Sequence, residues 1–590
     1  MNLAPAHTTT RTEPVTLASS EFPDFENASA SSLRPYFVFS AAVVLCLLPF
    51  SRKAFNVDDP LFVWTAKQVS LHPFDPYGFK LIWNTAEEPM WEITKNPPLA
   101  SYFLALIAKI AGWSELALHL GFLIPAIALV TGTYRLARRF TPLAWVAGVA
   151  TLASPGLLVS ATSVMCDTMM VALFVWAAAL WIEGSDASKW LLLVISALLI
   201  AACALTKYFG VALLLVLPLY SSLRRHRLGK HLMVLLLPIA ILIGYQLYTR
   251  ACYGQGLLSG AAAFSKAQRG ITMAAPLMTN LLIGLSFTGG SILPALVMAP
   301  LTFRRRWIVA GGFLSLVAGV SLTRGYLSLG SSALAGYIHF TLARHWLSLA
   351  IQLALAIGGG ISILALAIRQ SWQERNAGSM FLLSWVLGTF VFSVFVNWTI
   401  NARSLLPMIP AVGILLARQV EQIATQPRRR LKMKLALALG VSGFMALWVA
   451  KADANWADTQ RHAAEIICKR EQAKKTTVWF QGHWGFQYYM QALGAHPVDF
   501  DRSVLNANDL LVIPANNIET FPVKKDYIAS QELLEIPYHD VVTAMRFSKA
   551  SGFYSAAVGG PLPFAFGESR AERFFVFHLR SPAGPVAWDR

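Results

Sequence analysis

Charged residues are scarce in this sequence. Only 14% of its 590 residues are Asp, Glu, Lys or Arg, whereas a soluble protein carries roughly a quarter. Hydrophobic residues make up 55% of the chain, and the mean hydropathy is +0.51. So few charges exclude a soluble globular protein of this size, and most of the chain is expected to lie in lipid.

Cysteine is also scarce, with five residues in the whole chain. Cys46, Cys166 and Cys203 lie in or beside apolar segments, and the spacing of Cys252 and Cys468 does not suggest a pair. The sequence therefore contains no disulfide framework.

Long apolar runs are what the sequence has instead. The clearest approach or exceed roughly 18 residues, the length of a helix that crosses a bilayer. They cover residues 36–50, 116–134, 143–161, 190–206, 231–249, 346–368 and 379–396. A membrane β-barrel would need alternating strands of about ten residues, a pattern that is not seen. The runs predict an all-α polytopic membrane protein.

The net charge of +18 comes from basic residues in short loops between the apolar runs. Such clusters mark the cytoplasmic side of a membrane protein and set its orientation. They do not indicate a nucleic-acid partner, and we expect none. The clusters are Arg135, Arg138 and Arg139; Arg224, Arg225, Arg227 and Lys230; Arg304 to Arg306; and Arg428 to Arg430 with Lys432 and Lys434.

Placing every basic cluster in the cytoplasm predicts about thirteen spans, with the N-terminus inside and the C-terminus outside. Only one of two stretches, 98–112 and 116–134, fits as the crossing before Arg135. The first begins with two prolines and contains Lys109, so we expect it to lie on the outer face or dip into it. The other spans are expected at 36–50, 143–161, 167–183, 190–206, 208–222, 231–251, 276–301, two between 306 and 369, 379–397, 403–418 and 435–451.

These spans divide the chain into three parts. No cleavable signal peptide is visible, and residues 1–33 are expected to be a disordered cytoplasmic tail. Residues 34–454 form the transmembrane domain, with a first outer loop at 52–113, and 455–590 form an extracytoplasmic domain. Strands are predicted at 476–482, 508–514 and 573–579 and a helix at 484–493, which indicates a small α/β domain.

Ionisable residues gather at the expected outer ends of the spans. They are Asp58 and Asp59 after the first span, Lys95 in the outer loop, Asp167 before the fourth, Lys207 before the sixth and Arg403 at the twelfth. Ionisable groups near lipid are costly unless they face a cavity or a partner, so these are functional candidates. Two acids with several cations describe a site for a metal ion, or for a proton acceptor beside a phosphate.

Each of these residues also has a purely structural interpretation. Helix capping would explain Asp58, Asp59 and Asp167. Lys207 could extend along apolar surface to the membrane interface, and Lys95 and Arg403 could pair with lipid headgroups.

Several motifs resemble a known family in their order and spacing. After the acid pair come "NPPL", "SELALHLGFLIPAIALVTGTYRLARRF", "SPGLLVSATSVMCDTMMVALF", "ALLIAACALTKYFGVALLLVLP" and "NARSLLPMIPAVGILLARQ". Between about 36 and 450 the chain resembles the bacterial family 39 glycosyltransferases, which are relatives of protein O-mannosyltransferases and of the lipid A aminoarabinose transferase. The resemblance implies a C-type membrane glycosyltransferase (GT-C) fold and a polyprenyl-phosphate sugar as donor.

The resemblance also implies roles for individual residues. Asp58 matches the first acid of the family, a catalytic base or metal-site residue, and Asp59 stands where Glu is usual. These two would hold a divalent cation, Mg²⁺ or Mn²⁺. Asp167 matches a further acid, assigned here as catalytic. The expected substrate-binding residues are Asp59, Lys95, Asn96, Lys207 and Arg403; Asn96 stands where the family often has His, and Lys95 lies one place before a lysine of related enzymes.

The predicted activity is transfer of a hexosyl or pentosyl group to an acceptor hydroxyl at the outer face of the inner membrane. The acceptor could be a protein, a lipid or a polysaccharide. A transporter or flippase of a lipid-linked sugar is the alternative, with a polar path through the broken apolar segments 284–294 and 356–363. The polar residues lie at one side only, which favours an enzyme. A non-catalytic assembly factor would leave the acid pair unexplained.

Overall fold

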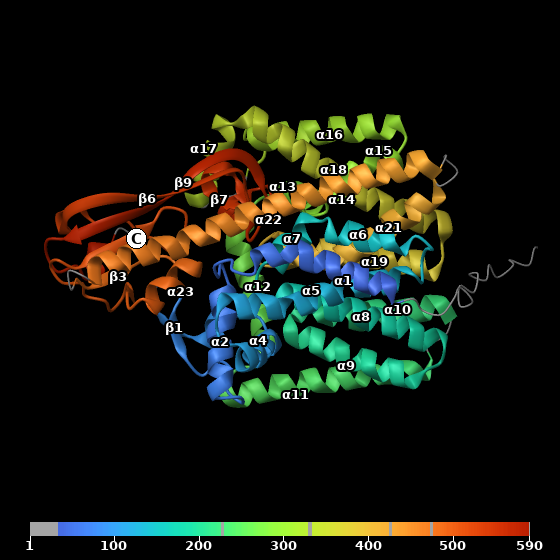
Figure 1. The fold of residues 1–590 in the computed structure, drawn as a ribbon, viewed down its shortest axis with the longest axis horizontal. Helices are drawn as coiled ribbons and strands as arrows, with labels where there is room; N and C mark the ends of the chain where they lie inside the picture. The colour runs from blue at the N-terminus through green and yellow to red at the C-terminus, as the bar shows by residue number, and fades with distance from the viewer. Residues whose placement is uncertain (1–32, 226–228, 329–332, 424–427, 473–475, 589–590) are drawn as a thin grey trace, which may run out of the picture.

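The protein is a bundle of nearly parallel helices with a small sheet domain at one end (Figure 1). The structure, a computed structural model, describes residues 33–225, 229–328, 333–423, 428–472 and 476–588. The predicted fold class, an all-α membrane region with a small C-terminal α/β domain, is confirmed.

Helices make up the membrane region. They are α1 (Arg34–Leu47), α5 (Glu115–Ala137), α6 (Ala144–Leu152), α7 (Pro155–Ala161), α8 (Cys166–Asp186), α9 (Trp190–Thr206), α10 (Leu213–Arg225), α11 (Leu236–Tyr253), α12 (Leu257–Thr272), α13 (Leu277–Ser291), α14 (Leu293–Val297), α15 (Ala299–Thr302), α16 (Arg305–Thr323), α17 (Ala333–Arg344), α18 (Trp346–Glu374), α19 (Ala377–Val391), α20 (Ala402–Leu405), α21 (Ile409–Gln422) and α22 (Arg428–Gln472).

Eight helices in the described ranges are long and apolar enough to cross a membrane, or up to ten if each of two bent pairs is one span. The chain is therefore a multi-pass membrane protein. Four shorter apolar helices accompany them, at Arg34–Phe50, Leu99–Ala111, Trp190–Thr206 and Tyr208–Arg224. The count of about thirteen spans stays a prediction.

Two predicted spans are broken rather than continuous. The span at 143–161 consists of α6 and α7, which meet at an angle of 60°. The span at 276–301 consists of α13, α14 and α15. Proline stands at the first or second position of each new piece, at Pro155, Pro294 and Pro300, because the N–H groups of the first turn have no partner within the helix whereas those of a helix interior do.

The glycine-rich segments that a transporter would use for a polar path are closely packed. A Cβ on Gly289 of α13 would overlap the carbonyl oxygen of Ala356 in α18, and one on Gly360 would overlap that of Leu285. The glycines thus let two helix backbones approach each other, as small residues do between membrane helices.

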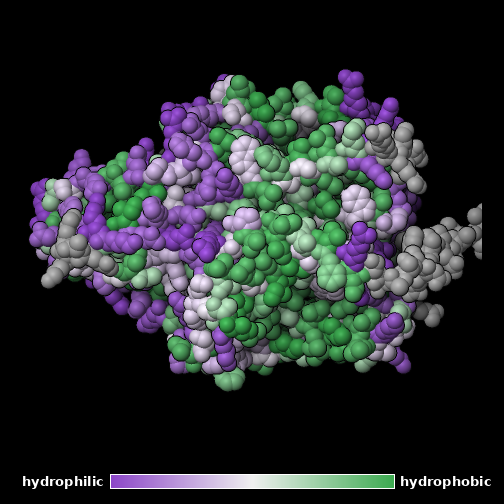
Figure 2. Space-filling model, viewed as in Figure 1, coloured by the Kyte–Doolittle hydropathy of each residue, from purple (hydrophilic) through white to green (hydrophobic). Residues whose placement is uncertain are grey.

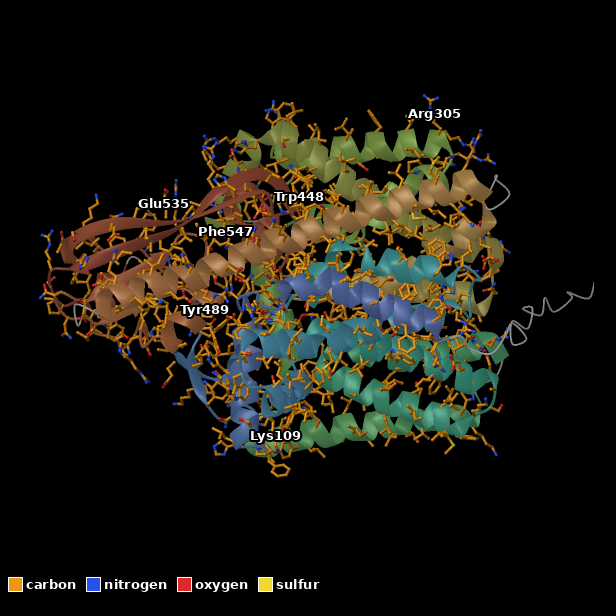
Figure 3. All side chains as sticks on the ribbon, viewed as in Figure 1. Lys109, Arg305, Trp448, Tyr489, Glu535 and Phe547 are labelled. Atoms are coloured by element: carbon orange, nitrogen blue, oxygen red, sulfur yellow. The ribbon has the colours of Figure 1, made fainter. Side chains whose placement is uncertain are left out.

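The surface has an apolar middle and two polar ends, and the orientation across the membrane stays a prediction. Figure 2 shows an apolar band over the helices, with polar residues on the sheet domain and at the opposite end. Figure 3 places Arg305 at the end of the bundle far from Glu535 of the sheet domain. Arg139 and Arg224 both contact Asp186 at 2.7 and 3.8 Å, so the basic loops after α5 and α10 meet the loop after α8 at one end.

The first outer loop lies across the ends of the spans (Figure 1). It contains α2 (Asp59–Leu71), β1 (Lys80–Ile82), β2 (Glu87–Pro89), α3 (Met90–Ile93) and α4 (Leu99–Ala111). The 13 residues of α4 extend over about 20 Å, less than the roughly 30 Å of a hydrocarbon core. That 98–112 does not cross the bilayer stays a prediction.

The outer domain is built on a five-stranded sheet of order β4-β3-β5-β9-β6. Its elements are β3 (Val478–Phe480), α23 (Trp484–Ala492), β4 (His496–Pro497), β5 (Leu510–Pro514), β6 (Ile528–Thr543), β7 (Met545–Arg546), β8 (Ser551–Gly552), α24 (Ala556–Gly559) and β9 (Ala565–Leu579). The three predicted strands correspond to β3, β5 and the end of β9, and the predicted helix to α23. The long edge strand β6 was not predicted, because it is largely exposed and contains Pro537.

One helix joins the membrane region to the outer domain. The 45 residues of α22 extend over about 67 Å, about twice the hydrocarbon thickness. The predicted domain boundary at 454/455 falls inside this helix. The outer domain is therefore attached by a continuous helix and not by a linker.

His483 connects the outer domain to the outer loop by stacking on Trp83, with ring centroids 5.2 Å apart. Burial lowers the pKa of His483 to about 4. In the unfolded chain the imidazole of His483 takes up a proton near pH 6.5, whereas in the folded protein it does so only near pH 4. The contribution of His483 to the free energy of unfolding is therefore fully present above pH 6.5 and is lost as the pH falls towards 4. We expect a loss of about 3 kcal/mol, measured as a falling melting temperature.

The variant His483→Gln should show a flatter dependence of melting temperature on pH over this range. His496, which is exposed on β4, offers the control: His496→Gln should leave the dependence as it is. An unchanged slope in His483→Gln would assign the pH dependence to other groups.

Candidate active site

Asp58 stands at the N-cap position of α2, yet its side chain makes no capping hydrogen bond. The residue before it, Val57, has φ 47°, a left-handed conformation that is strained for a β-branched side chain. The side chain of Asn56 supports this turn by accepting a hydrogen bond from Val57 N at 2.9 Å. Capping therefore does not explain Asp58, whose carboxylate points elsewhere.

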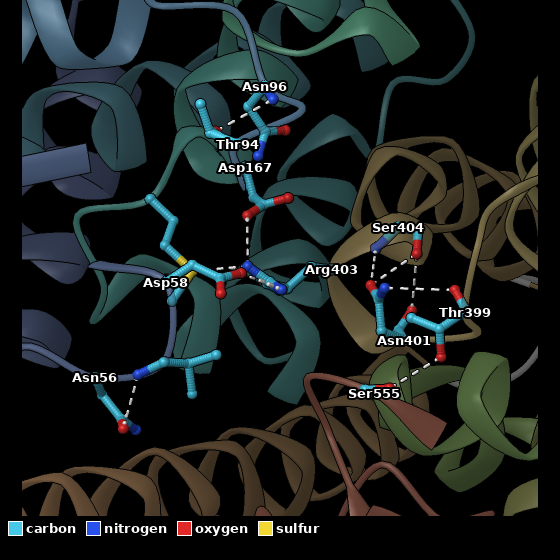
Figure 4. Close-up of polar contacts among 12 residues, drawn as sticks. Asn56, Asp58, Thr94, Asn96, Asp167, Thr399, Asn401, Arg403, Ser404 and Ser555 are labelled. Atoms are coloured by element: carbon cyan, nitrogen blue, oxygen red, sulfur yellow. Dashed lines mark hydrogen bonds and ion pairs between the residues drawn. The ribbon is translucent and has the colours of Figure 1, made fainter. Parts of the chain in front are cut away.

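Four of the predicted residues form a continuous chain of charges. Figure 4 shows three of them, Asp58, Arg403 and Asp167. Arg403 Nη2 donates to Asp58 Oδ2 at 2.9 Å, and Arg403 Nη1 lies 3.7 Å from Asp167 Oδ2. Lys207 Nζ donates to Asp167 Oδ1 at 2.5 Å. The side chains of Asp58 and Lys207 are 28% and 23% exposed, whereas Asp167 is 2% exposed. The two partly exposed ends thus offer a carboxylate and an ammonium group, and the buried carboxylate of Asp167 holds the two cations together.

The local structure explains how Arg403 reaches Asp58. Asn401 caps the short helix α20 by accepting from Ser404 N at 2.8 Å. The outer domain then holds the start of this helix, because Ala402 N donates to the Phe553 carbonyl at 2.9 Å. Figure 4 shows Arg403 directed from α20 towards Asp58 and Asp167.

Asp167 and Lys207 come from neighbouring helices. Asp167 lies in the first turn of α8, where a carboxylate also interacts favourably with the helix dipole. Lys207 directly follows α9 and has extended backbone angles, which end that helix. Since α8 and α9 run antiparallel, the start of one meets the end of the other.

Asp59 does not share the environment of Asp58. It is completely buried, and its two oxygens accept backbone hydrogen bonds from Asn56 N at 2.9 Å and Val164 N at 2.8 Å. Burial raises the pKa of Asp59 to about 7. Its carboxylate fixes the outer loop onto the segment before α8, and it has no open face for a substrate.

The predicted metal ligands do not fit a divalent cation. Asp58 is paired with Arg403, and both oxygens of Asp59 are occupied by backbone N–H groups. Within the described ranges, no group of three or more His, Cys, Asp or Glu residues is placed to hold a metal ion. We therefore assign no chemical step to a metal.

Lys95 and Asn96 lie in the outer loop, and within the described ranges neither forms an ion pair with the charge chain. The ammonium of Lys95 lies 5.1 Å from the ring centre of Phe264 in α12, and burial lowers the pKa of this lysine. The Asn96 carbonyl accepts from Tyr77 Oη at 2.7 Å. The structure thus places both residues as half-buried groups of the loop.

Three further residues extend the charge chain and were not predicted as site residues. Lys53 and Asp453 form a fully buried ion pair at 2.6 Å. Tyr554 of the outer domain donates to Asp453 at 2.9 Å, and its ring lies 5.3 Å from the Arg403 guanidinium. The position of a charged residue just after the first span was the only sequence signal for Lys53. No local pattern marks Asp453 or Tyr554.

A comparison with family models matches residues 95–248 to the dolichyl-phosphate-mannose-protein mannosyltransferase family. The resemblance predicted from the sequence is confirmed over this segment. It covers roughly a quarter of the chain and includes Lys95, Asn96, Asp167 and Lys207. The match favours a glycosyltransferase over a transporter. No curated protein sequence matches the chain.

Distant likenesses to solved structures accompany this match. ArnT from Cupriavidus metallidurans, bound to undecaprenyl phosphate, is 15% identical, with a TM-score of 0.44 and coverage of 82% of this chain and 94% of that one. The Archaeoglobus fulgidus oligosaccharyltransferase with a tethered acceptor peptide is 13% identical, with a TM-score of 0.45 and coverage of 81% and 68%. Mycobacterial arabinofuranosyltransferase AftD is 13% identical, with a TM-score of 0.41 and coverage of 95% and 40%. No residue role follows from likenesses this distant.

Proposed function

We propose that the protein transfers a hexosyl or pentosyl group from a polyprenyl-phosphate donor to an acceptor hydroxyl. The observation that carries the proposal is the chain Asp58–Arg403–Asp167–Lys207, in which four distant segments bring two acids and two cations together. The family match over residues 95–248 supports the same class of reaction. In the proposed orientation the site is at the outer end of the bundle, so the donor sugar would be presented outside the cytoplasmic membrane.

Asp58 is suited to accept the proton of the acceptor hydroxyl. As that oxygen attacks the anomeric carbon, its O–H proton passes to the Asp58 carboxylate and the bond from the anomeric carbon to the phosphate oxygen breaks. The electron pair of that bond remains on the phosphate, which leaves as polyprenyl phosphate. General-base assistance of this kind typically contributes about 10²–10⁴-fold in rate.

Arg403 and Lys207 are suited to stabilise the leaving phosphate. The sugar-linked phosphate carries one negative charge, and the released polyprenyl phosphate carries a charge closer to two. Arg403 Nε has no hydrogen-bond partner within the described ranges, and because it is buried, its donation to a phosphate oxygen requires a shift of the side chain when the donor binds. Donors held where charge develops stabilise the transition state.

Asp167 acts as a positioning residue in this proposal. With 2% exposure of its side chain, it contacts both cations and has no open path to a substrate.

The proposed orientation places the N-terminus in the cytoplasm and the outer domain on the periplasmic side of the inner membrane. The acceptor would then be a protein, lipid or polysaccharide on that side.

Lys207→Gln tests the phosphate role. Loss of a charge-assisted hydrogen bond to the donor should lower kcat/KM for the polyprenyl-phosphate sugar by about 10–150-fold. The measurement is release of polyprenyl phosphate by the purified protein. Lys189→Gln, at the exposed opposite end of α9, is the matched control and should behave like the unmodified protein. Unchanged kinetics in Lys207→Gln would remove this residue from the donor site.

A further inference from the structure

A groove of about 450 Å³ lies between α2, β1 and α23, apart from the charge chain. One wall comes from the first outer loop and the other from the outer domain, which meet at this point in Figure 1. Its volume lies within the range of small-molecule sites. Trp64, Lys67, Lys80, Tyr488 and Gln491 are the lining residues with chemical features for recognition.

The groove has a positive charge that no acid in its lining offsets. Lys67 and Lys80 line it, and no acidic residue is among the described residues that do so. Lys67 Nζ has no carboxylate partner within the described ranges; it lies 5.3 Å from the ring centre of Tyr488 and 5.9 Å from that of Trp113. Lys80 Nζ lies 3.9 Å from a carboxylate oxygen of Glu87, which is not among the lining residues. A ligand with a carboxylate or a phosphate would complete this charge.

Aromatic rings and an unpaired amide oxygen give the groove its second feature. The rings of Trp64 and Tyr488 lie 5.8 Å apart at 39°, so they form a bent apolar wall. The Oε1 atom of Gln491, a lining residue, is buried and has no hydrogen-bond partner within the described ranges, and a rotation of the side-chain amide would present it to a ligand hydroxyl. An apolar ring face beside hydroxyl-binding groups matches the C–H face and hydroxyls of a pyranose.

We propose that this groove binds an acidic pyranose unit, one that carries a carboxylate or a phosphate, of the acceptor. The inference rests on the proposed function, since it names the acceptor class for the reaction at Asp58. The helix α2 connects the two sites: Trp64 and Lys67 lie six and nine residues after Asp58, or about 9 and 13 Å along the helix axis. At about 100° per residue these two side chains lie on the side of α2 away from Asp58, so an acceptor that occupies the groove has to extend around α2 by several sugar units for a hydroxyl to reach Asp58.

Direct binding to the purified full-length protein, without any donor, tests the groove. The probes are tetragalacturonate, a hyaluronan tetrasaccharide and glucose 6-phosphate, and calorimetry measures their affinity. At least one should bind, and its neutral counterpart (the methyl ester, or glucose) should bind at least about tenfold more weakly. Absence of binding by all three acidic sugars, or equal binding of the neutral forms, would overturn the proposal.

Variants locate the binding. Lys67→Gln should weaken the acidic sugar at least about tenfold, and Lys109→Gln, an equal loss of charge on exposed α4, should not. Equal affinity in Lys67→Gln would contradict the groove. Glycerol 3-phosphate separates a sugar site from a lipid-headgroup site: binding as tight as that of the acidic sugars would contradict a sugar site.

The experiments can refute the acceptor groove and the proposed reaction separately. Asp58→Asn should bind the acidic sugars with unchanged affinity, because the groove does not include this carboxylate. Binding without any sugar transfer would retain the groove and refute the reaction. Transfer without binding of any acidic sugar would retain the reaction and refute the groove.

Discussion

Asp58→Asn is expected to reduce sugar transfer by about 10²–10⁴-fold while the protein stays folded and inserted. The amide keeps the size of the side chain, and its oxygen can still accept the hydrogen bond that Arg403 donates to Asp58 at 2.9 Å. It cannot accept a proton from the acceptor hydroxyl. Release of polyprenyl phosphate measures the activity, and the melting temperature measures the fold.

Asp59→Asn is the matched control, an identical change at the adjacent residue. Both oxygens of Asp59 accept backbone N–H groups, at 2.9 and 2.8 Å. An amide NH₂ cannot accept, so one buried N–H loses its partner at a cost of about 1–3 kcal/mol in stability. We expect a lower melting temperature with turnover per folded molecule near that of the unmodified protein. Full activity in Asp58→Asn would exclude Asp58 as the base.

Asp453→Ala is expected to destabilise the protein by about 3–5 kcal/mol, because it removes the ion-pair partner of the buried Lys53 ammonium. The two side chains form an ion pair at 2.6 Å and are both fully buried. Tyr554 would lose its acceptor at the same time. The melting temperature of the purified protein should fall by several degrees.

The double variant Lys53→Met/Asp453→Leu separates an unpaired charge from a general packing defect. Replacing both partners with apolar residues of similar size is often neutral, so most of the lost stability should return. Glu535→Ala is the control: it breaks an exposed ion pair with Arg573, and such pairs contribute at most about 1 kcal/mol. A double variant as unstable as Asp453→Ala would show that the charge is not the cause.

The sequence predicted the membrane fold and the approach of Asp58, Asp167, Lys207 and Arg403, because positive-inside loops place all four at the outer ends of spans. It did not predict that Asp59 turns away from Asp58. Successive residues at a helix start point about 100° apart, so adjacency in sequence does not make two carboxylates neighbours in space. Which of them faces the site depends on the backbone N–H groups of Asn56 and Val164.

The second part of the charge chain could not be predicted, because it depends on tertiary packing. Lys53 and Asp453 are 400 residues apart, and Asp453 lies in a helix that looks from its sequence like a span followed by a separate domain. Tyr554 follows β8 on a segment without any polar motif. Its proximity to Arg403 follows from the pairing of Ala402 with Phe553, which no single-sequence pattern indicates.

Because α22 is unbroken, the number of residues between the bilayer and the outer domain sets the angle at which the outer domain faces the membrane region. Each added or removed residue turns everything beyond it by about 100° and moves it by about 1.5 Å along the axis. A single deletion near 445 would therefore rotate Tyr554 away from Arg403, even though neither residue is changed. Seven added residues would nearly restore the angle, yet they would raise the outer domain by about 10 Å, well clear of the charges that it now covers.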